Sequence, residues 1–329
     1  MRVIDYKTIK KIKKAIMQYN TIIIHGHVRP DGDCYGSQFG LKDMIKTVFP
    51  HKTVYVVGQE CQYASFLGTM DVISDDVFQG ALSIIVDTGG DDKDSCRVSD
   101  TRFKLSAFVI KIDHHEQSLP FANINWIDEE SPACSQMVTN LFIYGKFNIT
   151  KNGAYALYTG IYTDTGGFKY RGVDGETMLS AGVLLENGVD VETFHQLINT
   201  RTLKTLDYYG YIYSNFKVVE PGIIYLIMKR EDIDRLELTN EEAANAVSNI
   251  GDIIGYPVWF LAIEYVKPDG TIEIRLRLRS ILDGINKLAE RYHGGGHSKA
   301  AGATLDSWDD FSKLLDELSN WVKENKTTN

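Results

Sequence analysis

A short buried strand that ends in a cluster of ligand-type side chains constrains this chain more than any other feature. Residues 21–24 form an apolar, β-branched run that stops abruptly at a polar loop, as a buried strand does. In that loop His27, Asp31 and Asp33 follow one another at spacings of four and two. Ligands of α/β sheets bind in the crevice beyond the carboxyl ends of the strands, so this loop predicts a ligand site.

The donor types in this loop favour a metal ion. Imidazole and carboxylate groups together suit Mn²⁺, Zn²⁺ or iron. A structural zinc site is disfavoured, because the four cysteines are widely spread and read as reduced thiols: Cys34, Cys61, Cys96 and Cys134. The alternative is that Asp31 and Asp33 only shape an Asx-type turn and cap the helix that follows.

Three further expected elements, two strands and a helix, also end in ligand-type side chains. They span residues 83–86, 107–112 and 152–162, and the side chains that follow them are Asp87, Asp113, His114, His115 and Asp164. Apolar strands separated by helices or long connections predict a mostly parallel, doubly wound α/β sheet. A single aspartate after a strand is usually a turn or cap residue, but the repetition favours one shared site.

A second, smaller α/β pattern begins near residue 216. In the strand-like stretch 271–280 the apolar residues alternate with glutamate and arginine, so one face of the strand is cationic. The run GGGH at 294–297, followed by Lys299, lets backbone N–H groups approach a phosphate closely. The arginines could instead form a solvated face, and three glycines could be a flexible helix end.

Composition narrows the class of protein. The chain has 329 residues, 43% hydrophobic and 24% charged, which is ordinary for a globular protein of two domains. No apolar run approaches the ~20 residues that span a bilayer, and the N-terminus lacks the apolar core of a signal peptide. We therefore expect a cytoplasmic protein without a membrane partner. A net charge of −9 weighs against binding long duplex nucleic acid but allows a pocket for a short phosphorylated ligand.

Five motifs in this order resemble the DHH phosphoesterases with a DHH-associated C-terminal domain. They are HVRPDGDCYGS at 27–37, VDT at 86–88, IDHH at 112–115, TDTG at 163–166 and GGGH at 294–297. Arg29 and the continuation GSQFGL look most like the NrnA-type oligoribonucleases and phosphatases and the related diadenylate-degrading enzymes. The likeness spans nearly the whole chain. We expect a catalytic domain over 1–190, a helical linker over 191–215 and a substrate-binding domain over 216–329.

The resemblance implies a site with two divalent ions, usually Mn²⁺, with Mg²⁺ or another ion as alternatives. One ion would be held by His27, Asp31 and Asp87. The other would be held by Asp33, Asp87, His114 and Asp164. The residues implied in catalysis are Asp87, Asp113, His114 and His115, of which Asp113 and His115 would lie behind the metal ligands or touch the phosphate. Those implied in substrate binding are Arg29, Arg279, Ser280, Gly294, Gly295, Gly296 and His297.

The implied reaction is hydrolysis of short phosphorylated ribonucleotides, such as linear pApA and nanoRNA, to mononucleotides, with removal of phosphate from pAp as a second activity. The alternatives are a phosphodiesterase for cyclic di-AMP, a single-strand-specific exonuclease and, outside the enzymes, a nucleotide-binding sensor. The sequence leaves open whether the chain forms a homodimer. Two departures from the family pattern concern the substrate side: Gly167 stands where relatives often carry arginine, and the segment 91–94 is unusually acidic.

Overall fold

The computed structural model describes residues 4–90, 97–115, 118–170, 172–267 and 269–326. The chain divides into two compact units, Met1–Thr200 and Arg201–Asn329. The division falls inside the segment 191–215 that we expected to be a helical linker. Within this segment α6 (Val191–Asn199) belongs to the first unit and α7 (Leu203–Asn215) to the second.

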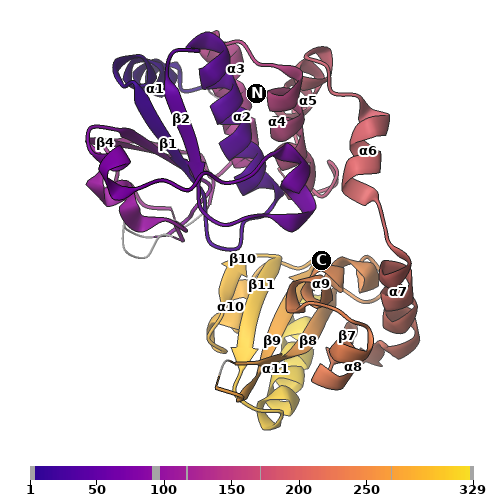
Figure 1. Ribbon diagram of the computed structural model, residues 1–329. Coiled ribbons are helices and arrows are strands. Elements are labelled where there is room, and N and C mark those ends of the chain that lie inside the picture. Colours follow the sequence, from indigo (N-terminus) through magenta and orange to yellow (C-terminus); the bar gives the residue numbers. More distant parts are fainter. Residues whose placement is uncertain (1–3, 91–96, 116–117, 171, 268, 327–329) are drawn as a thin grey trace. The chain divides into compact units, whose positions relative to one another are not determined.

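The first unit contains a five-stranded sheet, with strand order β2-β1-β3-β4-β5 and every pairing parallel (Figure 1). The strands are β1 (Thr21–His25), β2 (Thr53–Val57), β3 (Leu82–Val86), β4 (Phe108–Asp113) and β5 (Ile124–Ile127). All residues of β3 are buried, as expected for a central parallel strand covered on both faces. This sheet confirms the predicted α/β fold.

Helices and 3₁₀ segments cover the two faces of this sheet differently. The helices are α1 (Tyr6–Gln18), α2 (Gly32–Val48), α3 (Cys134–Gly145), α4 (Lys151–Asp164), α5 (Gly175–Glu186) and α6. One sheet face shares a large apolar core with α1 to α4. The other face packs under the 3₁₀ segments η2 (Asp75–Phe78) and η3 (Thr101–Leu105), and η1 (Gln62–Leu67) packs against α2. Within the described residues, none of the helices is long and apolar enough to cross a membrane.

The strand order places a topological switch point between β1 and β3. From β1 the chain continues to β2 on one side, and from β3 it continues to β4 on the other. Crevices at such points, beyond the carboxyl ends of the strands, are where open α/β sheets bind ligands. His27 follows β1 and Asp87 follows β3, so both residues flank this point.

The second unit is built on a six-stranded mixed sheet with strand order β10-β11-β9-β8-β7-β6, in which only the β7–β8 pairing is parallel. Its strands are β6 (Lys217–Val219), β7 (Ile223–Met228), β8 (Val258–Val266), β9 (Ile272–Ser280), β10 (Gly295–His297) and β11 (Ala300–Leu305). Its helical segments after α7 are α8 (Arg230–Arg235), α9 (Asn240–Asn245), η4 (Ala246–Ile250), α10 (Ile285–Glu290) and α11 (Asp309–Lys326).

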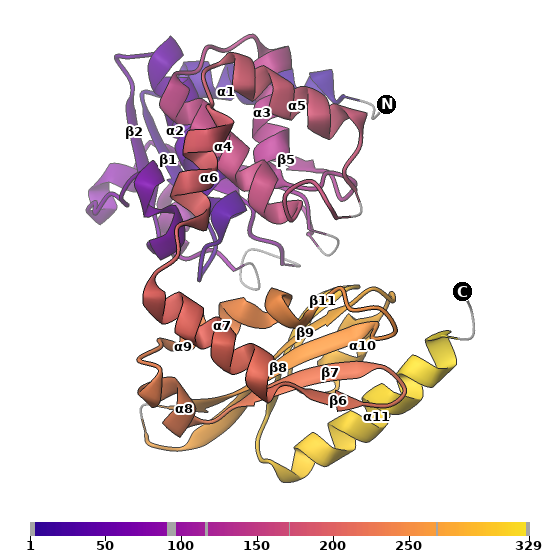
Figure 2. The same ribbon diagram turned by 90° about the vertical axis from the view of Figure 1, so that its right-hand side faces the viewer.

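Each face of the second sheet has its own apolar core. Residues of α10 and α11 pack on one face, and residues of α7, α8, α9 and η4 pack on part of the other (Figure 2). The alternation expected in β9 is present, with Ile274, Leu276 and Leu278 buried in the first core. The GGGH run is partly strand, because Gly295–His297 forms β10 and pairs with β11.

Candidate active site

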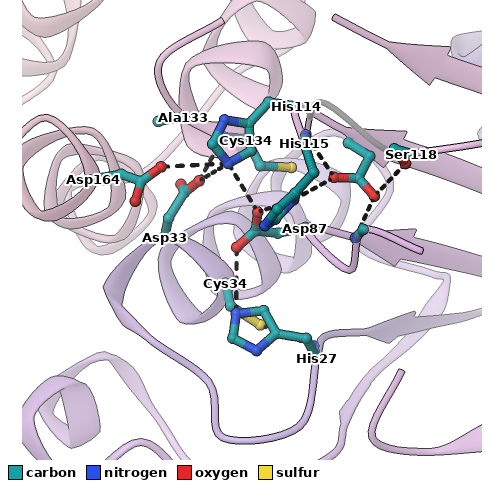
Figure 3. A network of polar contacts seen from close by, with 12 residues as sticks. His27, Asp33, Cys34, Asp87, His114, His115, Ser118, Ala133, Cys134 and Asp164 are labelled. Carbon is teal, nitrogen blue, oxygen red and sulfur yellow. Dashed lines mark hydrogen bonds and ion pairs between the residues drawn. The ribbon is translucent and has the colours of Figure 1, made fainter. Parts of the chain in front are cut away.

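The ligand-type side chains predicted from sequence converge beyond the carboxyl ends of β1, β3 and β4 (Figure 3). His27 lies in the loop between β1 and α2, and Asp31 and Asp33 stand at the start of α2. The others come from the ends of three further elements: Asp87 after β3, His114 after β4 and Asp164 at the end of α4. Segments far apart in the sequence therefore supply one site.

Asp87 lies between two histidines. Its Oδ2 is 3.6 Å from Nε2 of His27, and its Oδ1 is 3.2 Å from Nε2 of His114. His114 Nε2 also lies 3.7 Å from Oδ2 of Asp33 and 3.3 Å from Oδ2 of Asp164. One imidazole nitrogen thus faces three carboxylates, and the Asp87 carboxylate connects the two halves of the site.

Backbone carbonyls orient both imidazoles. His27 Nδ1 is 2.9 Å from the carbonyl oxygen of Val28, and His114 Nδ1 is 3.1 Å from that of Ser131. When the Nδ1–H of His114 donates to its carbonyl, the neutral ring presents the lone pair of Nε2 to the carboxylates. A lone pair that faces anionic oxygens is repelled by them unless a cation lies between.

The carboxylates of this site are crowded, and those of Asp33 and Asp87 are buried. Burial, together with the negative charge of Asp87, raises the pKa of Asp33 to about 7. Burial also raises the pKa of Asp164 well above its usual value, against the opposing effect of His114. The pKa of His114 is itself well above normal, because the nearby carboxylates of Asp87 and Asp164 outweigh the effect of burial. The site therefore has an excess of negative charge that positive charge would relieve.

Asp33 has a second role at the start of α3. Its Oδ2 accepts a hydrogen bond of 2.6 Å from the backbone N–H of Cys134, and its Oδ1 accepts one of 2.8 Å from that of Ser135. Helix N-termini favour carboxylates in this way. Because Asp33 is only 1% exposed, these bonds fix its orientation toward His114.

Asp31 differs from the other candidate ligands. Its Oδ1 caps α2 by accepting the backbone N–H groups of Asp33 and Cys34, so the turn-and-cap interpretation holds for this residue. The same Oδ1 lies 3.7 Å from His27 Nε2, and the side chain is 53% exposed. Asp31 therefore sits at the rim of the site.

The donor set fits divalent metal ions. Three groups of residues each bring ligand atoms within 4.8 Å of one another: Asp33, His114 and Asp164; Asp87, His114 and His115; His27, Cys34 and Asp87. Oδ1 of Asp87 is buried and accepts no hydrogen bond of good geometry among the described residues. A buried carboxylate oxygen that lacks a protein donor, placed beside imidazole nitrogens, is typical of a cation site.

Behind the candidate ligands, Asp113 organises the DHH segment. Its Oδ1 is 2.8 Å from Nδ1 of His115 and accepts the His115 backbone N–H at 3.2 Å. Its Oδ2 accepts hydrogen bonds from Ser118 Oγ and from the backbone N–H of Gly89, at 2.8 Å and 2.7 Å. Although burial opposes ionisation, the hydrogen bond from His115 and the charges of His115 and Lys111 hold the pKa of Asp113 at about 2.

Sequence reasoning missed three residues beside the site. Cys34, expected only to be a reduced thiol, is buried and accepts a 3.2 Å hydrogen bond from the His27 backbone N–H. Arg97 places Nη2 3.2 Å from His27 Nδ1. Lys111 is fully buried next to Asp113. Arg97 and Lys111 stand outside the quoted motifs and Cys34 stands inside one, but in each case the contacts depend on how separate segments pack.

The expected substrate-binding residues lie in both units. Arg29 belongs to the first unit and has a left-handed backbone, with φ of 54°. In the second unit, Arg279, Ala300 and His297 lie in one row across β9, β11 and β10. Ser280 ends β9, and its Oγ accepts the backbone N–H of Leu282. The structure thus brings Arg279 near the GGGH run.

The two departures from the family pattern have different outcomes. Gly167 has a φ of +71°, and an added Cβ would lie 3.2 Å from the ring of Tyr162. An arginine at this position would therefore be strained on this backbone. The acidic segment 91–94, like Cys96, lies outside the described residues.

Comparisons with known proteins match both units. The model of the DHH family, N-terminal domain, matches residues 21–161, and that of the DHHA1 domain matches residues 221–324. The chain is 34% identical over 317 residues to the bifunctional oligoribonuclease and PAP phosphatase NrnA of Bacillus subtilis (strain 168), covering 95% of this chain and 98% of that protein. It is also 34% identical over 314 residues to the probable bifunctional oligoribonuclease and PAP phosphatase NrnA of Streptococcus mutans, covering 95% and 99% of the two chains.

A solved structure shows the same fold. The exopolyphosphatase-related protein from Bacteroides fragilis superposes with a TM-score of 0.86 at 24% sequence identity, covering 98% of each chain. At this identity the likeness is one of fold.

Proposed function

Because this chain belongs to the DHH family, with a DHH domain followed by a DHHA1 domain, we propose that it is a metal-dependent phosphoesterase for short phosphorylated ribonucleotides. It hydrolyses substrates such as linear pApA and nanoRNA to mononucleotides, and it removes phosphate from pAp to leave AMP. The relatives named as oligoribonuclease and PAP phosphatase support this choice of substrates.

The position of Asp87 carries the proposal. Its two oxygens face His27 and His114 separately, at 3.6 Å and 3.2 Å, which is what a carboxylate shared by two ions requires. We propose that His27, Asp31 and Asp87 hold one Mn²⁺ ion. The second would be held by the remaining ligands together with Asp87: Asp33, His114 and Asp164. When bound, the ions would lower the pKa of a water molecule and neutralise charge on the phosphate.

The protein's own groups then hold the substrate and handle protons. Asp113 fixes the His115 ring through Nδ1, so Nε2 is the atom left to exchange a proton with a phosphate or leaving oxygen. Arg279 and backbone N–H groups of the GGGH run suit phosphate oxygens, because guanidinium forks and backbone amides both donate to them. The N–H of Gly294 already donates to the carbonyl of Ala289. We propose Arg29, in the first unit, as a further phosphate contact.

The test is a panel of substrates incubated with Mn²⁺, with Mg²⁺ and with a chelator, and analysed by chromatography. We expect AMP from pApA and from pAp, only with a divalent ion, and little release from a long single strand. Asp87→Asn keeps the shape of the side chain but removes its charge, so it should abolish turnover.

Other outcomes would identify other functions. Faster degradation of the long strand indicates a single-strand exonuclease, and linearisation of cyclic di-AMP indicates a cyclic-dinucleotide phosphodiesterase. Binding of pApA without turnover under any metal condition indicates a sensor and contradicts the proposal. We place the reaction in the cytoplasm, and a homodimer is the assembly to test by light scattering.

A further inference from the structure

A fully buried lysine lies directly beneath the site. Lys111, in β4, is 0% exposed. Its Nζ donates to the carbonyl oxygens of Gly89 and Leu119 at 3.1 Å and 3.3 Å, and it lies 3.4 Å from Oδ2 of Asp113. These three oxygens match the three donors of an ammonium group. A buried ammonium is costly unless it is paired and hydrogen-bonded. These contacts therefore fix the positions of Gly89, Leu119 and Asp113 as well as that of the lysine.

Two of these partners also bind each other. Asp113 Oδ2 accepts the backbone N–H of Gly89 at 2.7 Å, while Lys111 binds the carbonyl of the same residue. Asp113 and Lys111 therefore form hydrogen bonds to the N–H and the carbonyl of Gly89, respectively. Leu119 adds to this hydrogen-bond network, because its N–H donates to the carbonyl of Gly90 and its own carbonyl accepts from Lys111.

The segment held by these hydrogen bonds, Gly89 and Gly90, sets the position of Asp87. Both Asp87 and Gly89 have left-handed backbones, each with φ of +59°. Such a conformation is unfavourable for a residue other than glycine and persists only when its surroundings impose it. It directs the Asp87 carboxylate between His27 and His114. The carboxylate shared by the two halves of the site thus depends on how the next two peptides are held.

We infer that Lys111 is a positioning residue for the metal site: by clamping Gly89 together with Asp113, it holds Asp87 in the orientation that both ions require. The inference rests on the proposed metal-dependent function. Lys111 itself is not a ligand, because its ammonium group contacts two carbonyls and the Asp113 carboxylate.

The chain offers a matched control. Lys52 is 2% exposed, and its Nζ donates to the carbonyls of Met17 and Tyr19 at 3.1 Å and 2.7 Å. Both lysines also lie over an aromatic ring, at 4.7 Å for Lys111 and 5.3 Å for Lys52. Lys52 precedes β2 at the amino edge of the parallel sheet, opposite the site. Losing either ammonium group leaves two backbone carbonyls without this donor.

The experiment compares Lys111→Met with Lys52→Met in the full chain. Mn²⁺ binding is measured by electron paramagnetic resonance of the free and bound ion, at a temperature where circular dichroism shows each variant folded. We expect Lys111→Met to bind Mn²⁺ about 10- to 100-fold more weakly than wild type, the range seen when residues behind metal ligands are lost. Its kcat on pApA at saturating Mn²⁺ should fall more than its KM rises. Lys52→Met should lose stability but bind Mn²⁺ as wild type does.

Several results would overturn the inference. Unchanged Mn²⁺ binding and kcat in Lys111→Met would do so, as would an equal loss in Lys52→Met. If Lys111→Met does not fold, Lys111→Gln replaces it, because the amide retains donors for the carbonyls without the charge. If neither variant folds while Lys52→Met does, Lys111 is a core residue and the inference is wrong. Failure of wild type to bind Mn²⁺ or cleave pApA would instead refute the proposed function.

Discussion

The backbone N–H of Ser135 donates a 2.8 Å hydrogen bond to Oδ1 of Asp33, although 102 residues separate them in the sequence. This contact joins the start of α3 to the start of α2, next to His114. The contact requires α4 to pack very closely against α2 and α3. An added Cβ on Gly160 would lie 1.9 Å from Ser135 Oγ and 2.8 Å from Asp33 Oδ1. The packing of three helices therefore decides how one carboxylate is held.

The first prediction concerns this approach. Gly160→Ala should destabilise the protein by about 1–3 kcal/mol, as overpacked core positions do, and it should weaken Mn²⁺ binding by displacing Asp33. Gly182→Ala is the control, because an added Cβ there meets nothing within 4 Å in the middle of α5. It should raise stability by about 0.5–1 kcal/mol. Urea unfolding and Mn²⁺ titration measure both, and a neutral Gly160→Ala would contradict the geometry.

The second prediction concerns the stability gained from metal. Mn²⁺ that binds only the folded site should stabilise it by about 2.7 kcal/mol per site at a free concentration ~100 times its Kd. Thermal unfolding in Mn²⁺ and in chelator measures this difference. Asp87→Asn should lose most of the shift, because it removes the charge that faces both histidines. An equal shift in wild type and Asp87→Asn would place the Mn²⁺ elsewhere on the protein.

The third prediction concerns pH in the absence of metal. Burial and the charge of Asp87 raise the pKa of Asp33 to about 7, and nearby carboxylates raise the pKa of His114. Groups with a raised pKa bind more protons in the folded than in the unfolded state, so their contribution to stability is lost as pH rises. Burial lowers the folded pKa of His25 to about 4. Its effect on stability therefore has the opposite sign, but it acts only at pH values below the usual pKa of histidine.

In chelator, the melting temperature should therefore fall between about pH 6.5 and about pH 8. Saturating Mn²⁺ should reverse or flatten this slope, because the ions replace the protons as the positive charge of the site. A melting temperature in chelator that rises over the same interval would show that the carboxylates are not held as the structure has them.

The convergence of the main candidate ligands could be predicted from the sequence, because parallel strands end at one edge and His27, Asp87 and His114 each follow such a strand. The contacts that orient these ligands could not. Lys111 interrupts an apolar strand, and nothing local shows that it meets Gly89 and Leu119. Similarly, the sequence around Asp31 fits a helix cap and a metal ligand equally well. In the structure Asp31 caps α2, and its Oδ1 lies 3.7 Å from Nε2 of His27.

The triple glycine shows the same limit in the second unit. The sequence predicts a close approach to a phosphate or a flexible loop, and it treats the three glycines alike. In the structure they differ. A Cβ on Gly294 would lie 2.0 Å from the carbonyl oxygen of Gly302, and one on Gly296, whose φ is +136°, would lie 2.5 Å from that of Ala300. A Cβ on Gly295 meets nothing within 4 Å. Close packing of β10 against β11, which no local pattern reveals, makes this difference.

The fourth prediction follows from that difference. Gly294→Ala should destabilise the second unit by about 1–3 kcal/mol, because backbone atoms of β11 cannot move aside as a side chain can. Gly295→Ala should change stability by less than about 0.5 kcal/mol. If the GGGH run contacts substrate phosphate, Gly295→Ala should still raise KM for pApA, since a methyl group would stand where an N–H must approach an anion. Urea unfolding and steady-state kinetics separate the two effects: an unfolded Gly295→Ala would contradict the packing, and an unchanged KM would remove Gly295 from the substrate site.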